Sequence, residues 1–286
     1  MPGKVKALDG QFDLSGRLAV VTGAAGELCG TMAAVLAARG VKTVILDLDE
    51  EKAGQKAECI RAEGGEALAF GCNVLEEAEL ERCARAVEQR WGIPHILING
   101  AGGNHPSGSV ETDFFTGDLD RQDVKTFFNL PTEGFRNVLE LNFFGTVLPT
   151  KVFARGMVEK GRGNILNMSS MSAGTPLTRV AAYSAAKAAV SNFTRWLAVY
   201  LAKTGVRVNA LAPGFLMTEQ LRFLHIDRET GEYTPRAKKV IAHTPMERYG
   251  EPDELIGAML WLLSDASKFV TGTVIPIDGG FSSYTI

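Results

Sequence analysis

Cysteine, charge of one sign and long apolar runs are all scarce in this sequence of 286 residues. Its four cysteines, at positions 29, 59, 72 and 83, form no Cys-x-x-Cys pair and have no histidine close in sequence. This spacing excludes a zinc ribbon or a disulfide framework, so we expect reduced thiols, no metal site and a cytoplasmic location. The net charge of -3 gives no reason to expect nucleic acid or an anionic membrane as a partner.

No apolar run reaches the length of a transmembrane helix, and the first ten residues lack the apolar core of a signal peptide. Hydrophobic residues make up 45% of the chain and charged residues 22%, as is typical of a soluble globular protein. Because the chain has no repeat, low-complexity tract or linker, we predict a single domain over residues 1–286.

Strand and helix patterns alternate along much of the chain. Short apolar runs predict buried strands at 18–21, 41–46, 67–72, 95–98 and 165–168. Helices are predicted at 31–39, at 76–91 and around Tyr183. This alternation predicts an α/β fold of the Rossmann type, with one doubly wound parallel sheet and helices on both faces. In such folds a ligand binds at the carboxyl ends of the strands.

A glycine-rich turn, Gly23 to Gly30, follows the first predicted strand and leads into a helix. Glycines there let the backbone approach a pyrophosphate at the positive end of the helix, although a tight connection needs glycine in any case. Asp47 ends the second strand, where a carboxylate accepts hydrogen bonds from both ribose hydroxyls and repels a 2′-phosphate. We therefore predict NAD in preference to NADP; the alternative is that Asp47 only caps the next helix.

Tyr183 and Lys187 are four residues apart on a predicted helix, so their side chains share one face. A lysine ammonium beside a tyrosine hydroxyl favours the phenolate, and we expect it to lower the pKa of Tyr183. Ser170, at the end of a predicted strand, can hydrogen-bond the same substrate oxygen. This grouping suits hydride transfer to or from a carbonyl with Tyr183 handling the proton. Alone, a Tyr-x-x-x-Lys pair is more often an ordinary half-exposed helix face.

Seven short motifs follow one another in a fixed order: T-G-x-x-G, N-G-A-G, N-x-x-G, S-S, Y-x-x-x-K, N-x-x-x-P-G and I-D-G-G. From about Phe12 to Phe281 this order resembles the short-chain dehydrogenase/reductase family. The resemblance implies that Tyr183 is the catalytic acid and base, and that Lys187 lowers its pKa and holds the nicotinamide ribose. It also implies that Ser170 steadies the substrate oxygen and that Asn142 holds a water connecting Lys187 to solvent.

The same resemblance implies a set of cofactor-binding residues: Gly23, Gly26, Glu27, Leu28, Asp47, Asn73, Val74, Asn99, Ala101, Gly102, Tyr183, Lys187, Pro213, Gly214, Leu216 and Thr218. The chain departs from the family pattern in its turn, where Glu27 and Cys29 replace glycines. A glutamate near a pyrophosphate is unfavourable unless it points to solvent. Asn73 replaces a common aspartate, and Gly100 replaces the second asparagine of the N-N-A-G motif.

In detail, stretches such as G-A-G-G-N-H-P, S-S-M-S-A-x-T-P-L-T and H-T-P-M-E-R-Y-G-E-P most resemble the short-chain type D-mannonate oxidoreductases. That branch, which shares the shifted glycine turn ending in L-C-G, interconverts D-fructuronate and D-mannonate with a nicotinamide cofactor. Two enlarged segments, about 103–135 and 215–250, are expected to shape the substrate pocket. We call them the substrate loop and the lid segment.

Polar residues in and near these two segments suit a carboxylated, hydroxyl-rich substrate, because arginine pairs with carboxylate in a bidentate manner. The predicted substrate-binding residues are Asn104, His105, Arg179 and His243, with Arg222 as a further polar group. Singly, each also fits a solvated surface residue or a structural hydrogen bond. A related gluconate or polyol dehydrogenase and a catalytically idle nucleotide-binding scaffold stay open as alternatives. The alanine-rich Tyr183 helix, by the family resemblance, predicts a homotetramer.

Overall fold

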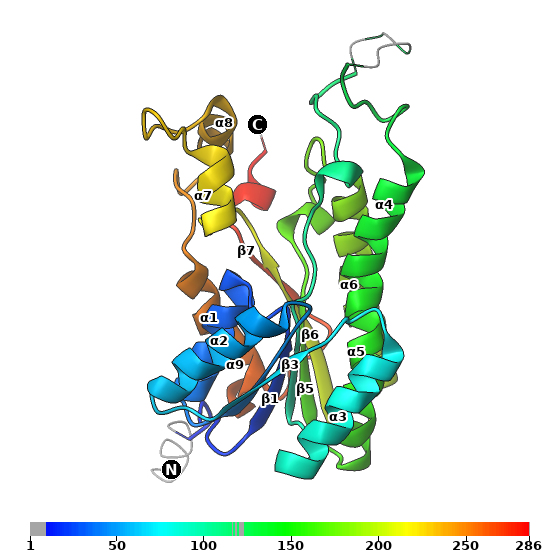
Figure 1. Cartoon of the computed structure of the whole chain (residues 1–286), viewed down its shortest axis with the longest axis vertical. Coiled ribbons are helices and arrows are strands. Elements are labelled where there is room, and N and C mark those ends of the chain that lie inside the picture. Colours follow the sequence, from blue (N-terminus) through cyan, green and yellow to red (C-terminus); the bar gives the residue numbers. More distant parts are fainter. Residues whose placement is uncertain (1–9, 116, 118, 120–122, 286) are drawn as a thin grey trace.

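One seven-stranded parallel sheet organises the molecule, with the strand order β3-β2-β1-β4-β5-β6-β7 (Figure 1). The computed structural model describes residues 10–115, 117, 119 and 123–285. Its strands are β1 Leu18–Thr22, β2 Lys42–Asp47, β3 Ala67–Gly71, β4 Ile96–Asn99, β5 Gly163–Met168, β6 Val206–Pro213 and β7 Val274–Ile277. The order reverses between β1 and β4, which creates the switch point where such sheets bind ligands. The predicted Rossmann-type fold is confirmed.

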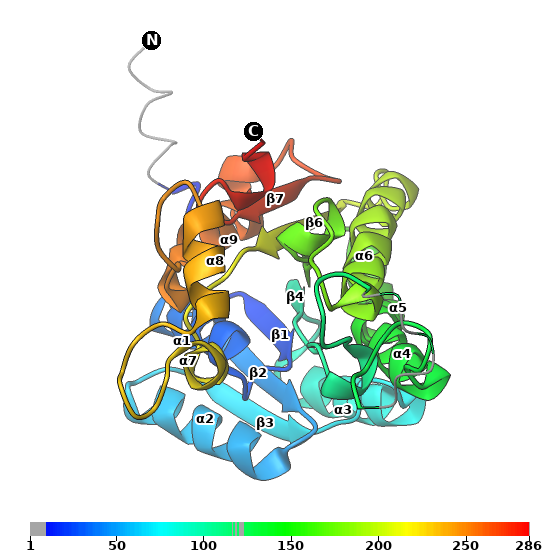
Figure 2. The ribbon, with the colours of Figure 1, turned by 90° about the horizontal axis from the view of Figure 1, so that it is seen from above.

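Helices cover both faces of the sheet (Figure 2). On one face lie α1 Glu27–Ala38, α2 Glu50–Ala62 and α9 Ile256–Leu263; on the other lie α3 Glu77–Trp91, α5 Gly145–Glu159 and α6 Ala181–Tyr200. Alternate residues of β1 enter different cores, Ala19 and Val21 on the first face and Leu18 and Val20 on the second. Because both faces of this strand are buried, its sequence is continuously apolar instead of alternating.

The predicted element bounds differ from the observed ones mainly at the first helix. The helix predicted at 31–39 begins four residues earlier, at Glu27, because only Gly23 in the turn needs a left-handed backbone (φ 65°) and Gly26 is already extended. The strands shift by one or two residues; for example, β5 begins at Gly163 instead of 165. Within the described residues, none of the helices combines the length and the apolar character that crossing a membrane requires.

Two groups of short elements stand above the carboxyl ends of the strands, on opposite sides (Figure 1). The substrate loop leads through η1 Pro106–Gly108 to α4 Thr132–Leu139 and the π-helical turn η2 Glu140–Phe144. The lid segment forms α7 Glu219–His225 and α8 Pro235–His243. Of the substrate loop, residues 116, 118 and 120–122 lie outside the described residues, as does 1–9 of the predicted single domain. The remaining short turns are η3 Met171–Ala173, η4 Pro252–Leu255, η5 Asp265–Ser267 and η6 Phe281–Ser283.

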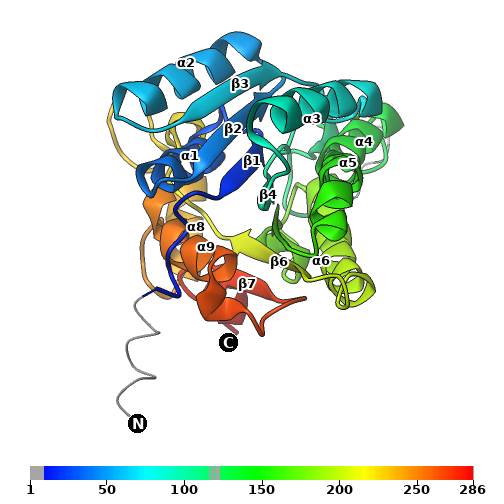
Figure 3. The same cartoon turned by 90° about the horizontal axis from the view of Figure 1, so that it is seen from below.

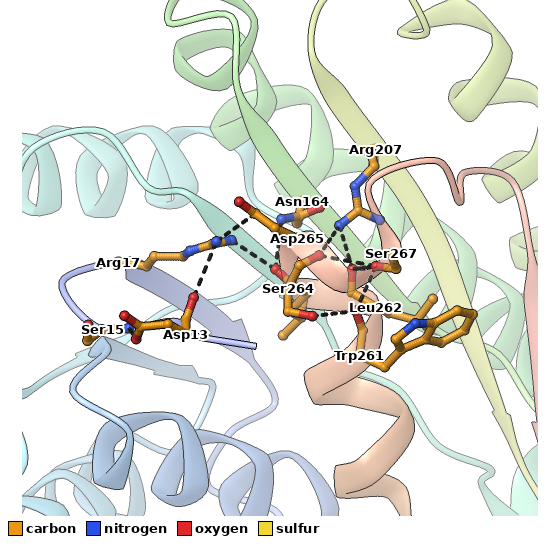
Figure 4. A network of polar contacts seen from close by, with 11 residues as sticks. Asp13, Ser15, Arg17, Asn164, Arg207, Trp261, Leu262, Ser264, Asp265 and Ser267 are labelled. Atoms are coloured by element: carbon orange, nitrogen blue, oxygen red, sulfur yellow. Dashed lines mark hydrogen bonds and ion pairs between the residues drawn. The ribbon is translucent and has the colours of Figure 1, made fainter. Parts of the chain in front are cut away.

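The view from below shows α9 beside the amino ends of the strands (Figure 3). There, two arginines close the carboxyl end of α9 (Figure 4). Arg207 donates hydrogen bonds to the carbonyls of Leu262 and Ser264, at 2.7 and 3.0 Å, and Arg17 donates to that of Leu263 at 2.9 Å. The last carbonyls of a helix have no partner within it, so these guanidinium groups satisfy them. The amino ends of the strands are thereby tied to α9, and the carboxyl ends of the strands remain available for a ligand site.

Candidate active site

A cavity of about 410 Å³ opens at the switch point, above the carboxyl ends of β1, β2 and β4. Seven residues of the predicted cofactor set line it: Gly23, Gly26, Asp47, Asn73, Val74, Ala101 and Gly102. Seven others that the sequence did not indicate also line it: Ala25, Leu48, Asp49, Lys52, Cys72, Gly100 and Leu141. Leu48 is 76% exposed, and an exposed apolar side chain beside Asp47 offers a surface for a flat aromatic ring.

Two loops approach each other closely at the floor of this cavity, and glycine permits the approach. A Cβ on Gly23 would lie 2.8 Å from the backbone of Ala101, and one on Gly102 would lie 2.6 Å from Oδ1 of Asn142. The hydroxyl of Thr22 accepts hydrogen bonds from the amides of Gly100 and Ala101, at 3.0 and 3.1 Å, and fixes the pair of loops. The glycines therefore serve backbone contact here as well as access for a ligand.

Two departures from the family pattern compensate each other. Cys29 stands where a glycine is usual, and its Sγ occupies the space that a Cβ on Gly100 would need. Gly100 stands where an asparagine is usual, so the smaller residue accommodates the larger one. Because the Cys29 side chain needs a glycine at position 100, the two changes fit each other in the packing of the shifted turn.

The residues around the cavity fit a dinucleotide. The amino end of α1 faces the turn with no side-chain cap, which leaves backbone N–H groups for a diphosphate. The carboxylate of Asp47 accepts hydrogen bonds from the amides of Ala25 (3.0 Å) and Asp49 (3.2 Å), so its orientation is fixed at the rim. Lys52 is ion-paired with Asp49 at 2.9 Å.

Glu27 contacts the lid segment. Its Oε2 accepts a hydrogen bond of 2.8 Å from the amide of Glu219, the first residue of α7. Glu27 and Leu28 are absent from the cavity lining, although both belong to the predicted cofactor set. The carboxylate thus caps a lid helix and is directed away from the glycine-rich turn's cavity.

Ser170, Tyr183 and Lys187 converge beside the cavity. The Oγ of Ser170 accepts hydrogen bonds from the amide and the hydroxyl of Ser172, at 3.2 and 3.0 Å. Its own proton is therefore free for the hydrogen bond that it shares with the Tyr183 hydroxyl. The ammonium of Lys187 donates to the carbonyl of Met168 at 2.8 Å and lies 3.3 Å from the position of a Cβ on Gly102, a cavity-lining residue.

The expected effect of Lys187 on Tyr183 is not observed, and the direction is opposite. Burial raises the pKa of Tyr183, and the hydrogen bond from Ser170 is what opposes that rise. The ammonium lies 5.5 Å from the centroid of the Tyr183 ring and is directed at the Met168 carbonyl, so its charge does not dominate the hydroxyl. Burial also lowers the pKa of Lys187 to about 8, which leaves this side chain mostly protonated at neutral pH.

Asn142 holds the loop that follows β4. Its side-chain amide donates to the carbonyls of Gly103 and Val138, both at 2.8 Å, and its Oδ1 accepts from the Gly103 amide at 3.0 Å. The residue lies in the π-helical turn η2, a distortion that often accompanies functional sites. Since the side chain is committed to protein groups, its direct effect is to position Gly102 and Gly103.

Asn99 points away from the cavity. Its amide donates to Thr150 and Asn167, both at 2.8 Å, in the interior under α5 and α6, and its buried Oδ1 has no partner among the described residues. Only its backbone is placed to approach a cofactor.

The remaining predicted contacts lie around the end of β6 and the start of the lid segment: Pro213, Gly214, Leu216 and Thr218. Thr218 is the N-cap of α7 and accepts from the Leu221 amide.

The predicted substrate-binding residues do not all meet. Asn104 bonds Ser109 at 2.9 Å, and His105 bonds Ser107 at 2.7 Å, so both are held within their own loop. His243 packs its ring against Phe281 and Tyr284 near the carboxyl end of the chain. Arg222 is exposed and lies 3.8 Å from Glu219.

Arg179 contacts the substrate loop. Its Nε donates to Asp113 of the substrate loop at 2.6 Å, and the same carboxylate lies near Arg236 and Lys239 of α8. The sequence patterns had not indicated Asp113, Arg236 or Lys239 as site residues. The segment T-P-R-A-K-K contains the signal that would have found two of them, because a Thr-Pro helix start places Arg236 and Lys239 on one helix face.

Comparisons with known proteins agree with this geometry. The family model described as enoyl-(acyl carrier protein) reductase matches residues 23–282. An uncharacterized oxidoreductase of Haemophilus influenzae is 47% identical over 274 residues, which are 96% of this chain and 95% of that protein.

Two solved structures are similar over nearly the whole chain. One, with bound NAD, is of a candidate D-mannonate oxidoreductase from Haemophilus influenzae; it has a TM-score of 0.91 and 47% identity and covers 96% of this chain and 97% of its own. The other is a gluconate 5-dehydrogenase from Burkholderia cenocepacia in complex with NADP and tartrate, with a TM-score of 0.82, 32% identity and coverage of 98% and 100%. The chain is therefore an oxidoreductase and belongs to the short-chain dehydrogenase/reductase family.

Proposed function

We propose that this protein is an NAD(H)-dependent oxidoreductase of a sugar acid, most specifically the enzyme that interconverts D-fructuronate and D-mannonate. The observation that carries the proposal is that Ser170, Tyr183 and the buried Lys187 come together at the edge of a cavity that suits a dinucleotide. The similarity to a candidate D-mannonate oxidoreductase over 96% of the chain supports the choice of substrate.

The residues divide the work of ketone reduction. When bound, a reduced nicotinamide supplies the hydride for the carbonyl carbon. Tyr183 donates its hydroxyl proton to the carbonyl oxygen, and Ser170 donates a hydrogen bond to that oxygen as it gains charge. Lys187, held by the Met168 carbonyl, keeps a positive charge close to the proton-donating group and helps it recover a proton. In the reverse direction, Tyr183 accepts the alcohol proton. Asn142 acts by positioning the loop beneath the cofactor.

NAD is proposed over NADP because the Asp47 carboxylate, fixed by the Ala25 and Asp49 amides, faces the cavity where a 2′-phosphate would bring like charge. The related Haemophilus structure holds NAD, whereas the Burkholderia one holds NADP. The four free thiols fit a reducing compartment, and we propose the cytoplasm.

We also propose a homotetramer. Exposed faces of α6 and of η2 carry a run of aromatic rings in contact, from Phe144 through Phe143 and Phe193 to Trp196 and Tyr200. Trp196 is 56% exposed and Tyr200 is 69% exposed, which is unusual for large rings unless another surface covers them. Exposed small residues at the start of α6, Ala181 and Ala185, allow close approach of a second helix.

The proposal is tested by following oxidation of NADH, and separately of NADPH, with D-fructuronate, D-tagaturonate and 5-keto-D-gluconate. We expect rapid turnover of NADH with D-fructuronate alone. Tyr183→Phe should lower kcat by about 10²- to 10⁴-fold, while the matched variant Tyr200→Phe on the same helix should retain it. Full activity of Tyr183→Phe would contradict the mechanism.

The second candidate is a gluconate dehydrogenase, which the Burkholderia relative favours. Turnover of 5-keto-D-gluconate in place of D-fructuronate would select it and leave the mechanism intact. An idle nucleotide-binding scaffold would bind NADH and reduce none of the three ketones.

A further inference from the structure

Three cations from two parts of the molecule surround one carboxylate, that of Asp113. Asp113, in the substrate loop, lies 2.6 Å from Nε of Arg179, 3.3 Å from Nζ of Lys239 and 3.9 Å from the Arg236 guanidinium. Arg179 precedes the catalytic helix α6, whereas Arg236 and Lys239 belong to α8 of the lid segment. The cluster therefore joins the substrate loop and the start of α6 to the lid segment.

The cluster has more positive than negative charge. Among the described residues, Asp113 is the one acid within 4.0 Å of any of these three cations. The ionisable groups next to Arg236 are neutral at pH 7: burial lowers the pKa of His225 and raises that of Tyr249 to about 12. One carboxylate thus faces three cations, and the region attracts a second anion.

Among the described residues, Arg236 is the cation of the three that makes no hydrogen bond. Arg179 already makes a short bond to Asp113, and Lys239 is 75% exposed. The Arg236 side chain is only 34% exposed, and among the described residues no acceptor lies within hydrogen-bond distance of its guanidinium. Its helix is anchored by Ala237 and Val240, which are buried against Met217 and Tyr249, so the guanidinium is held in place near Asp113. The planar guanidinium of Arg236 has five N–H donors, and its geometry matches the two oxygens of a carboxylate.

Arg179 is held by a strained backbone. Its φ is 72°, in the left-handed region that a residue with a side chain rarely adopts. Its carbonyl accepts a hydrogen bond of 2.9 Å from the Val110 amide, which ties the strained residue to the substrate loop. The strain lies four residues before Tyr183, so it sets the position of Arg179 relative to the proton donor.

We propose that Arg236 of the lid segment binds the substrate carboxylate, with Arg179 and Asp113 positioning it, so that the enzyme selects acidic polyhydroxy ketones over neutral ones. This inference rests on the proposed function. The ketone and the carboxylate of such a substrate are at separate positions of one carbon chain. Tyr183 holds the ketone end, and the lid segment closes on the other end when its arginine binds the carboxylate.

The test compares D-fructuronate with D-fructose, its neutral analogue, in the full-length enzyme with NADH. Arg236→Met should lower kcat/KM for D-fructuronate by about 10- to 150-fold and leave that for D-fructose unchanged. Arg236→Lys keeps the charge but loses the planar guanidinium. Its kcat/KM for D-fructuronate should therefore lie between those of the unchanged enzyme and of Arg236→Met. Lys238→Met is the matched control, because this neighbouring lysine is 63% exposed and pairs with Glu232. The control should behave like the unchanged enzyme.

Equal losses for both sugars, or no loss for either, in a normally folded Arg236→Met variant would overturn the inference and leave the proposed function standing. A separate binding measurement covers the opposite case. Calorimetric titration with D-mannonate in the presence of NAD should give weaker binding for Arg236→Met and Arg236→Lys than for Lys238→Met. If no uronate is turned over but the Arg236 variants bind D-mannonate more weakly than Lys238→Met does, the proposed reaction fails and carboxylate recognition stands. If all of these variants bind D-mannonate equally well, carboxylate recognition by Arg236 is overturned.

Discussion

At the scale of single residues, burial has more influence on the reacting groups than the charge of their neighbours. The Tyr183 hydroxyl keeps a raised pKa, and Lys187 keeps a lowered one of about 8 against an ordinary 10.5. Lys187 is 4% exposed, so its charge is retained at the expense of stability. Such a cost is common where function requires a buried ionisable group.

The burial of Lys187 predicts a pH dependence of stability. Between pH 8 and 10.5 the unfolded chain binds this proton and the folded chain does not, so the free energy of unfolding rises with pH in that window. Below pH 8 both states are protonated and the full penalty, about 3 kcal/mol, applies. In denaturant titrations at pH 7 and pH 10.5, the stability of the unchanged protein should rise relative to Lys187→Met by up to that amount. A pH-independent difference would contradict the assigned pKa.

The Asp47 carboxylate predicts the cofactor preference. Asp47→Asn keeps an oxygen that accepts from the Ala25 amide but removes the charge that faces the cavity. We expect the ratio of kcat/KM for NADPH to that for NADH to rise about tenfold, because the like-charge penalty on a 2′-phosphate disappears. Asp49→Asn, whose charge is already paired with Lys52, should change the ratio less. An unchanged ratio in Asp47→Asn would limit Asp47 to holding the amides of Ala25 and Asp49, since the N-cap of α2 is Asp49.

At the scale of elements, Glu27 links the glycine turn to the lid segment. Its bond to the amide of Glu219 connects residues 192 positions apart in sequence. A lid helix of seven residues is too short to be stable alone, so caps from elsewhere matter for its order. The departure from the glycine pattern thus gives the lid segment a contact that a glycine cannot provide.

Glu27→Ala should make the lid segment more susceptible to trypsin, with cleavage at Arg222 and Arg228 increasing about fivefold for a capping loss of about 1 kcal/mol. Glu27→Gln keeps an acceptor oxygen and should be protected nearly as well as the unchanged protein. Glu58→Ala, an exposed substitution on α2, is the control. Digestion is followed by mass spectrometry. Equal cleavage of Glu27→Ala and the control would show that the cap does not order α7.

At the scale of the whole molecule, the exposed aromatic run on α6 predicts the assembly. Trp196→Glu places a charge in the centre of the rings that contact Phe193 and Tyr200, and burying it between subunits is unfavourable. We expect light scattering after gel filtration to give a mass near four times 30.8 kDa for the unchanged protein and a smaller mass for the variant. Gln55→Glu on α2 should leave the mass unchanged. A monomeric unchanged protein would contradict the homotetramer.

The fold and half of the cavity lining were predictable because their signals are local. Buried parallel strands are continuous apolar runs, and each strand end carries its ligand-facing residue within a few positions, as Gly23, Asp47 and Ala101 do. Asn99 was assigned to the cofactor set from the same position, but its side chain points into the core, because strand residues alternate between faces.

The sequence by itself determined five of the seven strands, the helix that carries Tyr183 and Lys187, and the family, since these depend on periodicity and on short spacings. Only the tertiary structure decided that Gly100 makes room for Cys29, that Glu27 caps α7, and that Arg236 and Lys239 meet Arg179 at Asp113. These contacts join segments far apart in the chain, and no local pattern encodes which distant residue a side chain will meet. The tertiary structure also decided the direction of the Tyr183 pKa shift, because desolvation depends on everything packed around the hydroxyl.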